Sequence, residues 1–176
     1  NNGVEANVET DPVPEYGDIP FDDKKTYLGA RLNELRNPFY LTHAWGFEQV
    51  TDAGLGICLD LCHNRTIYLA AKNWDKENVL NESDWTELAG KALFDDVKAL
   101  YHSDLVHLND GRGEYSRANK TVFEEGVALG QGDISDLREI INHLDNRKIP
   151  YVLEINESDY KNRPETRASI EYLLRA

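Results

Sequence analysis

Short apolar runs alternate with longer amphipathic segments along the chain. Four runs predict strands, at Gly3 to Glu9, Gly56 to Asp60, Leu105 to Leu108 and Ile149 to Ile155. The second run is apolar until it ends abruptly in Asp60, and His63 follows three residues later. This pattern is typical of a buried parallel strand that carries a functional group at its C-terminal end.

Apolar residues recur at helical spacing between the predicted strands. The clearest pattern predicts a helix capped by Ser135, with an apolar stripe at i, i+3, i+4 and i+7 formed by Leu137, Ile140, Ile141 and Leu144. A long loop rich in Gly, Asn and charged residues is expected from residue 109 to residue 132. Two short helices are predicted at Thr42 to Thr51 and at Ile67 to Ala71. Three further helices are predicted: one capped by Asp22 or Asp23, one capped by Ser83 with apolar positions Leu88, Leu93, Val97 and Leu100, and a last one that begins at Pro164. Strand and helix in alternation predict an α/β fold with a parallel sheet and right-handed crossovers.

Each predicted strand ends on a residue that can bind a metal ion: Glu9, Asp60, His107 and Glu154. In a barrel these C-terminal strand ends meet at one rim, where active sites lie. Three carboxylates and an imidazole form a donor set suited to zinc, manganese or magnesium. Taken singly, Asp60 is more typical of a turn and His107 of a core histidine, and Glu5 competes with Glu9. Glu154 lies between two apolar residues, so we expect a buried carboxylate that needs a partner.

Composition bounds the class of protein. The 176 residues suffice for one domain with a core, and the net charge of −13 disfavours non-specific attraction to nucleic acid, although a local basic groove remains open. No apolar stretch approaches the roughly 20 residues of a membrane helix, so we expect an intracellular, cytoplasmic protein without a membrane partner. Cys58 and Cys62 are expected to be reduced. Because the chain lacks methionine and a leader, we expect it to be part of something longer.

Three stretches carry a resemblance to a known family. They are Cys58 to His63, Leu105 to Arg112 and Leu129 to Ile134, and in this order they resemble the three signatures of the endonuclease IV family, or AP endonuclease family 2. That family belongs to the xylose isomerase-like TIM barrels. The resemblance implies that residues 1–176 form a single partial domain, the C-terminal four to five β/α units of an eight-stranded barrel.

The resemblance also implies roles for individual residues. It makes Glu9, Asp60, His107 and Glu154 metal ligands, and His63 either a ligand or a substrate contact. One departure concerns the third signature, in which the family carries an Asp-x-His pair that serves another zinc. The corresponding stretch here is Glu124-Glu125-Gly126, and no histidine occurs between His107 and His143.

Three functions remain open on these residues. In the first, a zinc- or manganese-activated water hydrolyses a phosphodiester at an abasic site in DNA, with Arg112, Arg117 and Asp110 binding substrate. The arginines could equally be solvated loop charges. In the second, the protein is a metal-dependent isomerase or epimerase of a sugar or sugar phosphate, with Glu9 and Glu154 moving the proton and His63 and Arg112 contacting substrate oxygens. The third is a degenerate barrel without catalysis.

The predicted half barrel has an additional consequence for assembly. Its two terminal strands would be open edges beside an exposed core. We therefore expect self-association or a partner chain that supplies the missing strands.

Overall fold

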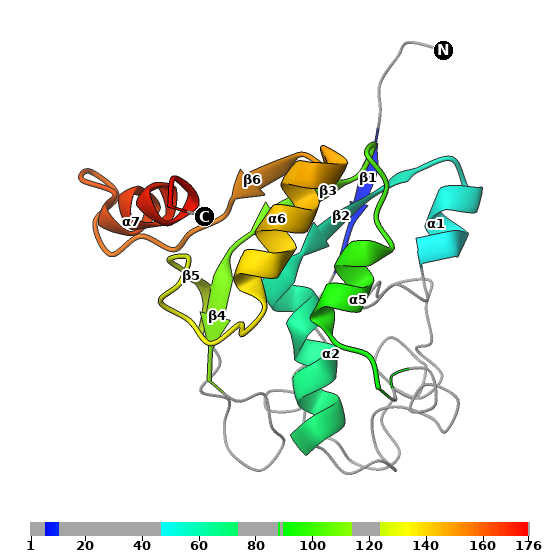
Figure 1. Ribbon diagram of the computed structural model, residues 1–176, viewed down its shortest axis with the longest axis horizontal. Coiled ribbons are helices and arrows are strands. Elements are labelled where there is room, and N and C mark those ends of the chain that lie inside the picture. Colours follow the sequence, from blue (N-terminus) through cyan, green and yellow to red (C-terminus); the bar gives the residue numbers. More distant parts are fainter. Residues whose placement is uncertain (1–5, 11–46, 74–87, 89, 114–123, 176) are drawn as a thin grey trace, which may run out of the picture.

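A four-stranded parallel sheet organises the computed structural model, which describes residues 6–10, 47–73, 88, 90–113 and 124–175 (Figure 1). The strand order is β1-β2-β3-β6, and every neighbouring pair is parallel. A separate antiparallel pair joins β4 and β5. The strands are β1 (Asn7–Glu9), β2 (Gly56–Asp60), β3 (Leu105–Leu108), β4 (Asp110–Arg112), β5 (Glu124–Val127) and β6 (Tyr151–Leu153). The helices are α1 (Phe47–Asp52), α2 (Leu61–Asn73), α5 (Leu93–Lys98), α6 (Leu137–Arg147) and α7 (Pro164–Leu173). The predicted α/β fold with a parallel sheet is confirmed.

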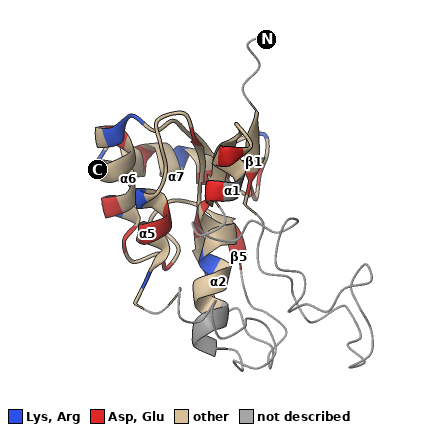
Figure 2. Cartoon of the chain, turned by 90° about the vertical axis from the view of Figure 1, so that its right-hand side faces the viewer, with Lys and Arg blue, Asp and Glu red and all other residues tan. Residues whose placement is uncertain are grey.

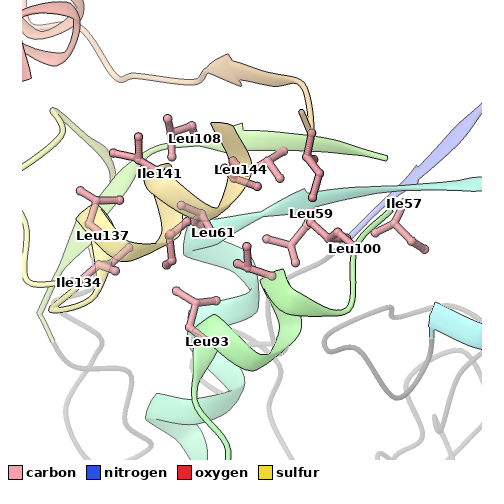
Figure 3. Close-up of a cluster of buried hydrophobic side chains, with 14 of the residues drawn as sticks. Ile57, Leu59, Leu61, Leu93, Leu100, Leu108, Ile134, Leu137, Ile141 and Leu144 are labelled. Carbon is pink, nitrogen blue, oxygen red and sulfur yellow. The ribbon is translucent and has the colours of Figure 1, made fainter. Parts of the chain in front are cut away.

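Helices cover one face of the sheet. Side chains of β2 that point to this face, such as Ile57 and Leu59, meet the apolar stripe of α6 and residues of α5 (Figure 3). Leu144 and Ile140 of α6 are fully buried. Burial of these aliphatic side chains, at about 25 cal/mol per Å² of apolar surface, supplies the main stabilisation of the helical layer. The core therefore lies between the sheet and the helices.

The opposite face of the sheet carries the chemistry. Because side chains alternate along a strand, Cys58 and Asp60 point away from the face that bears Ile57 and Leu59. Asp60 lies directly across from His107 in the register of β2 and β3. Val152 of β6, which pairs with His107, is 53% exposed. No helix among the described residues covers this polar face.

Backbone groups at the start and end of β2 are held by side chains that lie next to the neighbouring strands, just before β3 and just after β1. Ile57 N–H donates to Asp104 Oδ1 at 2.9 Å, and Asp60 N–H donates to Thr10 Oγ1 at 2.9 Å. Asp104 and Thr10 are both buried. A Cβ at Gly56 would overlap the Asn7 side chain, so this side chain would have to shift if Gly56 were replaced. The register that brings the strand ends together is thereby fixed.

Several helices begin or end at other residues than the sequence predicts. The helix expected from Ser83 through Leu100 is interrupted, because Gly90 adopts a φ of 75° and α5 begins only at Leu93. Helix α2 is longer than the predicted Ile67 to Ala71 and starts directly after Asp60, which places His63 in its first turn. The N-cap of α6 is Asp136 and not Ser135.

The expected long loop after β3 contains the β4–β5 pair, which was not predicted. The last strand, β6, is shorter than Ile149 to Ile155. Pro164 begins α7 as predicted. The helix expected after Asp22 or Asp23, the cap at Ser83, and parts of the first strand and of Thr42 to Thr51 lie outside the described residues. Within the described part of the chain, no helix has the length and apolarity needed to span a membrane.

Candidate metal centre

The four strand-end residues converge on one point, as expected. One potential ligand atom from each of Glu9, Asp60, His107 and Glu154 lies within 4.8 Å of the others. His107 Nδ1 is 3.2 Å from Glu9 Oε1, 3.8 Å from Asp60 Oδ2 and 2.6 Å from Glu154 Oε2. We call these four residues the strand-end cluster. Parallel pairing explains the convergence, because it brings the C-terminal ends of β1, β2, β3 and β6 to one edge.

Asp60 is the buried member of the strand-end cluster. The residue is 1% exposed, and both carboxylate oxygens accept hydrogen bonds. Oδ1 accepts from His63 N–H at 2.8 Å, at the start of α2, and Oδ2 accepts from Asn109 Nδ2 at 2.9 Å. Burial raises the pKa of Asp60 to about 6 despite these bonds and the nearby His63. A cation at this position would favour the charged form and offset the repulsion among the carboxylates.

His107 provides a test of whether a cation fits. Its Nδ1 is buried and forms no aligned hydrogen bond within the described part of the chain, although three carboxylates face it. A buried nitrogen without a hydrogen bond costs free energy unless another ligand binds it. One nitrogen and several carboxylate oxygens form a set that zinc and manganese accept. The strand-end cluster therefore fits a divalent cation.

The two glutamates line the open side of the cluster. The side chain of Glu9 is 46% exposed and that of Glu154 is 56% exposed. The expectation that Glu154 is buried is wrong, because Glu154 follows an edge strand, β6, whose residue Val152 on the polar face is also exposed. Glu154 is still anchored, since its N–H donates to Leu108 O at 3.2 Å. Both carboxylates can reach a ligand from solvent.

His63 lies beside the cluster and is not one of its four members. Its Nδ1 is 2.7 Å from Thr10 O, so a proton on Nδ1 would be donated to this carbonyl and Nε2 would carry the free lone pair. Nε2 is 3.6 Å from Glu125 Oε2. Burial lowers the pKa of His63, but Asp60, Thr10, Glu125 and Glu9 raise it, and the net result is a raised pKa.

Comparisons with known proteins point to one group of enzymes. No protein-family model matches the chain. Three curated proteins named "Probable endonuclease 4" do match part of the chain. One, from Halobacterium salinarum, is 32% identical over 111 residues, which is 62% of this chain and 35% of that protein. Another from Natronomonas pharaonis is 28% identical over 141 residues, 79% of this chain and 42% of that protein. A third from Methanosphaera stadtmanae is 30% identical over 105 residues, 58% of this chain and 32% of that protein.

The chain is related to endonuclease IV. It spans between about a third and two fifths of the length of these relatives. The endonuclease IV signatures described above lie on β2 and α2, on β3 and β4, and in the turn before α6. Two of the three thus contain a member of the strand-end cluster, Asp60 in the first and His107 in the second.

The stretch that departs from the endonuclease IV signature lies on β5. Glu124 forms an ion pair with Arg112, with Nε 2.9 Å from Oε2, and Glu125 faces His63. Gly126 has a φ of 68°. Where the signature has its Asp-x-His pair, this chain therefore has an acidic side chain next to His63. Acidic segments are prominent at β1, α1, α5 and β5, whereas basic segments are scattered, with one of them on α2 (Figure 2).

The predicted substrate contacts differ in their surroundings. Arg112 is 51% exposed and paired with Glu124, and Arg117 lies outside the described residues. Asp110 is buried, and its carboxylate accepts hydrogen bonds from the backbone N–H groups of Gly111, Gly130, Gly132 and Ile134. These contacts give Asp110 a structural role in the turn before α6.

Sequence patterns missed three residues of the site. Thr10 binds both Asp60 and His63, Asn109 binds Asp60, and Glu125 faces His63. Asn109 follows His107 by two residues in the second signature, and that proximity was the available signal. Cys58 and Cys62 are free, as expected, and burial raises the pKa of the Cys58 thiol to about 12, which keeps it protonated.

Proposed function

We propose that this chain is part of a metal-dependent phosphodiesterase of the endonuclease IV type, which hydrolyses the DNA backbone at abasic sites. The observation that carries the proposal is the convergence of Glu9, Asp60, His107 and Glu154 at one edge of a parallel sheet. The relationship to endonuclease IV supports it. We also propose that residues 1–176 form a single partial domain, the C-terminal part of a xylose isomerase-like TIM barrel.

In this proposal the strand-end cluster holds zinc or manganese, with magnesium as a further possibility. The bound ion would supply Lewis acidity at a phosphate oxygen and lower the pKa of a water molecule that attacks phosphorus. Asp60 is the fixed ligand, because hydrogen bonds hold both of its oxygens. Glu9 and Glu154 are exposed enough to change position when substrate enters.

His63 and Arg112 are the proposed contacts with substrate. His63 keeps Nε2 available because Thr10 O occupies Nδ1, and Nε2 lies at the open side with Glu125. Arg112 could exchange its exposed partner Glu124 for a phosphate, since an exposed ion pair is worth only about 0–1 kcal/mol. Because the net charge of −13 repels the phosphate backbone, attraction to DNA has to come from local cations such as Arg112.

The glutamates also favour a second candidate, a sugar isomerase or epimerase. Glu9 Oε1 and Glu154 Oε2 approach the same imidazole nitrogen, at 3.2 Å and 2.6 Å. Two exposed carboxylates beside one cation can transfer a proton between adjacent carbons of a sugar. The acidic stretch Glu124-Glu125 next to His63 suits a polyol better than a phosphodiester.

The deciding experiment measures metal content and two activities on the same purified protein. Zinc or manganese binding together with incision of duplex DNA at an abasic site, both lost in Asp60→Ala, is the expected result. The matched control is Asp52→Asn, an exposed aspartate of α1, which should keep both properties. Exchange of a sugar C–H proton with solvent, without incision, would favour the isomerase. Absence of any bound metal would contradict both enzymes and leave the non-catalytic barrel.

A further inference from the structure

Asn109 lies between the strand-end cluster and the start of α2. It follows β3 directly and is 3% exposed. Its Nδ2 donates to Asp60 Oδ2 at 2.9 Å, and its Oδ1 accepts from Cys62 N–H at 3.1 Å. The two ends of the Asn109 amide therefore connect the end of β3 with the end of β2 and with the start of α2.

The bond from Asn109 reaches the oxygen of Asp60 that faces the cluster. Asp60 Oδ2 is the carboxylate oxygen 3.8 Å from His107 Nδ1. The other oxygen, Oδ1, is held by His63 N–H at 2.8 Å. With one donor on each oxygen, rotation of the carboxylate about its Cβ–Cγ bond would break at least one hydrogen bond. Each oxygen keeps a second lone pair, so the orientation is fixed without using up the capacity to bind a cation.

A second buried asparagine shows what a purely structural contact looks like. Asn64 of α2 is 0% exposed, and its Nδ2 donates to Asp96 Oδ2 at 2.7 Å. The residue type, the burial and the kind of hydrogen bond match those of Asn109. One difference is that Asn109 Oδ1 also accepts from Cys62 N–H, whereas Asn64 Oδ1 has no hydrogen-bond partner among the described residues. The difference that the test uses is the acceptor, because Asp96 belongs to α5 and is not part of the strand-end cluster.

We propose that Asn109 is a positioning residue, which holds Asp60 in the orientation that binds a divalent cation. The proposal rests on the metal site of the proposed function. Groups that orient a metal ligand through a hydrogen bond typically change metal affinity about 10- to 100-fold when they are removed. Asn109 satisfies the geometric condition for such a group, since its donor meets the ligand oxygen itself.

The test compares Mn²⁺ affinity in paired variants, measured by the EPR signal of free Mn²⁺ and by calorimetry. Asn109→Ala should weaken Mn²⁺ binding about 10- to 100-fold, whereas Asn64→Ala should leave it within about twofold. Thermal unfolding of the metal-free proteins measures the structural cost, and we expect both variants to lose stability. Should Asn109→Ala fail to fold, Asn109→Leu and Asn64→Leu, which fill nearly the same volume, replace the pair with the same expected contrast.

The outcomes separate this proposal from the proposed function. Equal Mn²⁺ affinity in the wild-type protein and the Asn109 variants would overturn the positioning role, even if DNA is incised. An equal loss of affinity in the Asn64 variants would also overturn it, because the effect would then follow stability. A selective loss in the Asn109 variants without incision by the wild-type protein would support the positioning role and contradict the nuclease. A wild-type protein that binds no Mn²⁺ would overturn both.

Discussion

Asp60 couples the ionisation of the site to the stability of the metal-free fold. Its pKa is raised by burial from an ordinary value of 3.8 to about 6. Between these two values the folded protein binds a proton that the unfolded chain does not bind. The free energy of unfolding therefore rises as the pH falls from 7 to 4. The raised pKa of His63 acts in the same direction, because its contribution is lost as the pH rises.

We predict that Asp60→Asn flattens this pH dependence. The metal-free wild-type protein should gain on the order of 2 kcal/mol in free energy of unfolding between pH 7 and pH 4 from Asp60. The asparagine variant cannot take up that proton, so its gain should be smaller. Urea unfolding at several pH values after removal of metal by chelation provides the measurement, with Asp52→Asn as control. Identical pH profiles for wild type and Asp60→Asn would refute the shift.

At the residue scale, the convergence of the strand-end cluster could be predicted, whereas the residues that hold it in place could not. Glu9, Asp60, His107 and Glu154 follow from one rule, since each lies at or within one residue of the C-terminal end of a strand and parallel strands end at one edge. Thr10 and Asn109 contact Asp60 from about 50 residues away in the sequence. A Thr or Asn carries no periodic signal, and only the three-dimensional register shows what it binds.

At the element scale, the segment between β3 and α6 departs furthest from the sequence-based expectation. The β5 strand contains Glu124 and Glu125, so it lacks the apolar alternation by which strands are predicted. The pair β4–β5 is instead anchored by Asp110, which binds four backbone N–H groups around the turn at Gly130 and Gly132. Likewise, the apolar spacing around Leu93 continues across Gly90, whose positive φ ends the helical path.

We predict that Asp110→Asn destabilises the fold by about 2–4 kcal/mol. In the wild-type protein the Asp110 carboxylate accepts hydrogen bonds from four backbone N–H groups. The amide NH₂ of asparagine is a donor and cannot accept from them, and the remaining hydrogen bonds would lose their charge assistance. Urea unfolding measures the loss, and hydrogen exchange should accelerate at Gly130 and Gly132. Asp52→Asn again serves as control. Unchanged stability combined with weaker substrate binding would instead support the substrate contact predicted from the sequence.

At the scale of the whole molecule, the helices that the structure describes cover one face of the sheet. Among the described residues, β1 and β6 each pair with a single strand, and Val152 on the inner face is 53% exposed. Open edges and an exposed inner face favour pairing with further strands. The strand-end cluster opens onto this same face, so whatever covers the face also encloses the site.

We predict that the chain by itself associates in a concentration-dependent manner. Sedimentation velocity over about a hundredfold range of concentration should show a rising mean sedimentation coefficient. Val152→Lys places a charge on the edge strand β6 and should reduce the association. A stable monomer at every concentration would contradict the prediction, as would association that Val152→Lys leaves unchanged.

Gly126 restricts which side chains this part of the site can hold. The endonuclease IV signature has a histidine at the corresponding position, but a Cβ at Gly126 would lie 2.7 Å from Asn156 Nδ2, and the φ of 68° is strained for any L side chain. Asn156 N–H and Nδ2 donate to the carbonyls of Gly126 and Glu125, at 2.8 Å and 2.9 Å, and hold this backbone in place. A histidine introduced at Gly126 would therefore require Asn156 and the surrounding backbone to move. The side chain that faces His63 on this strand is consequently that of Glu125 and not that of residue 126.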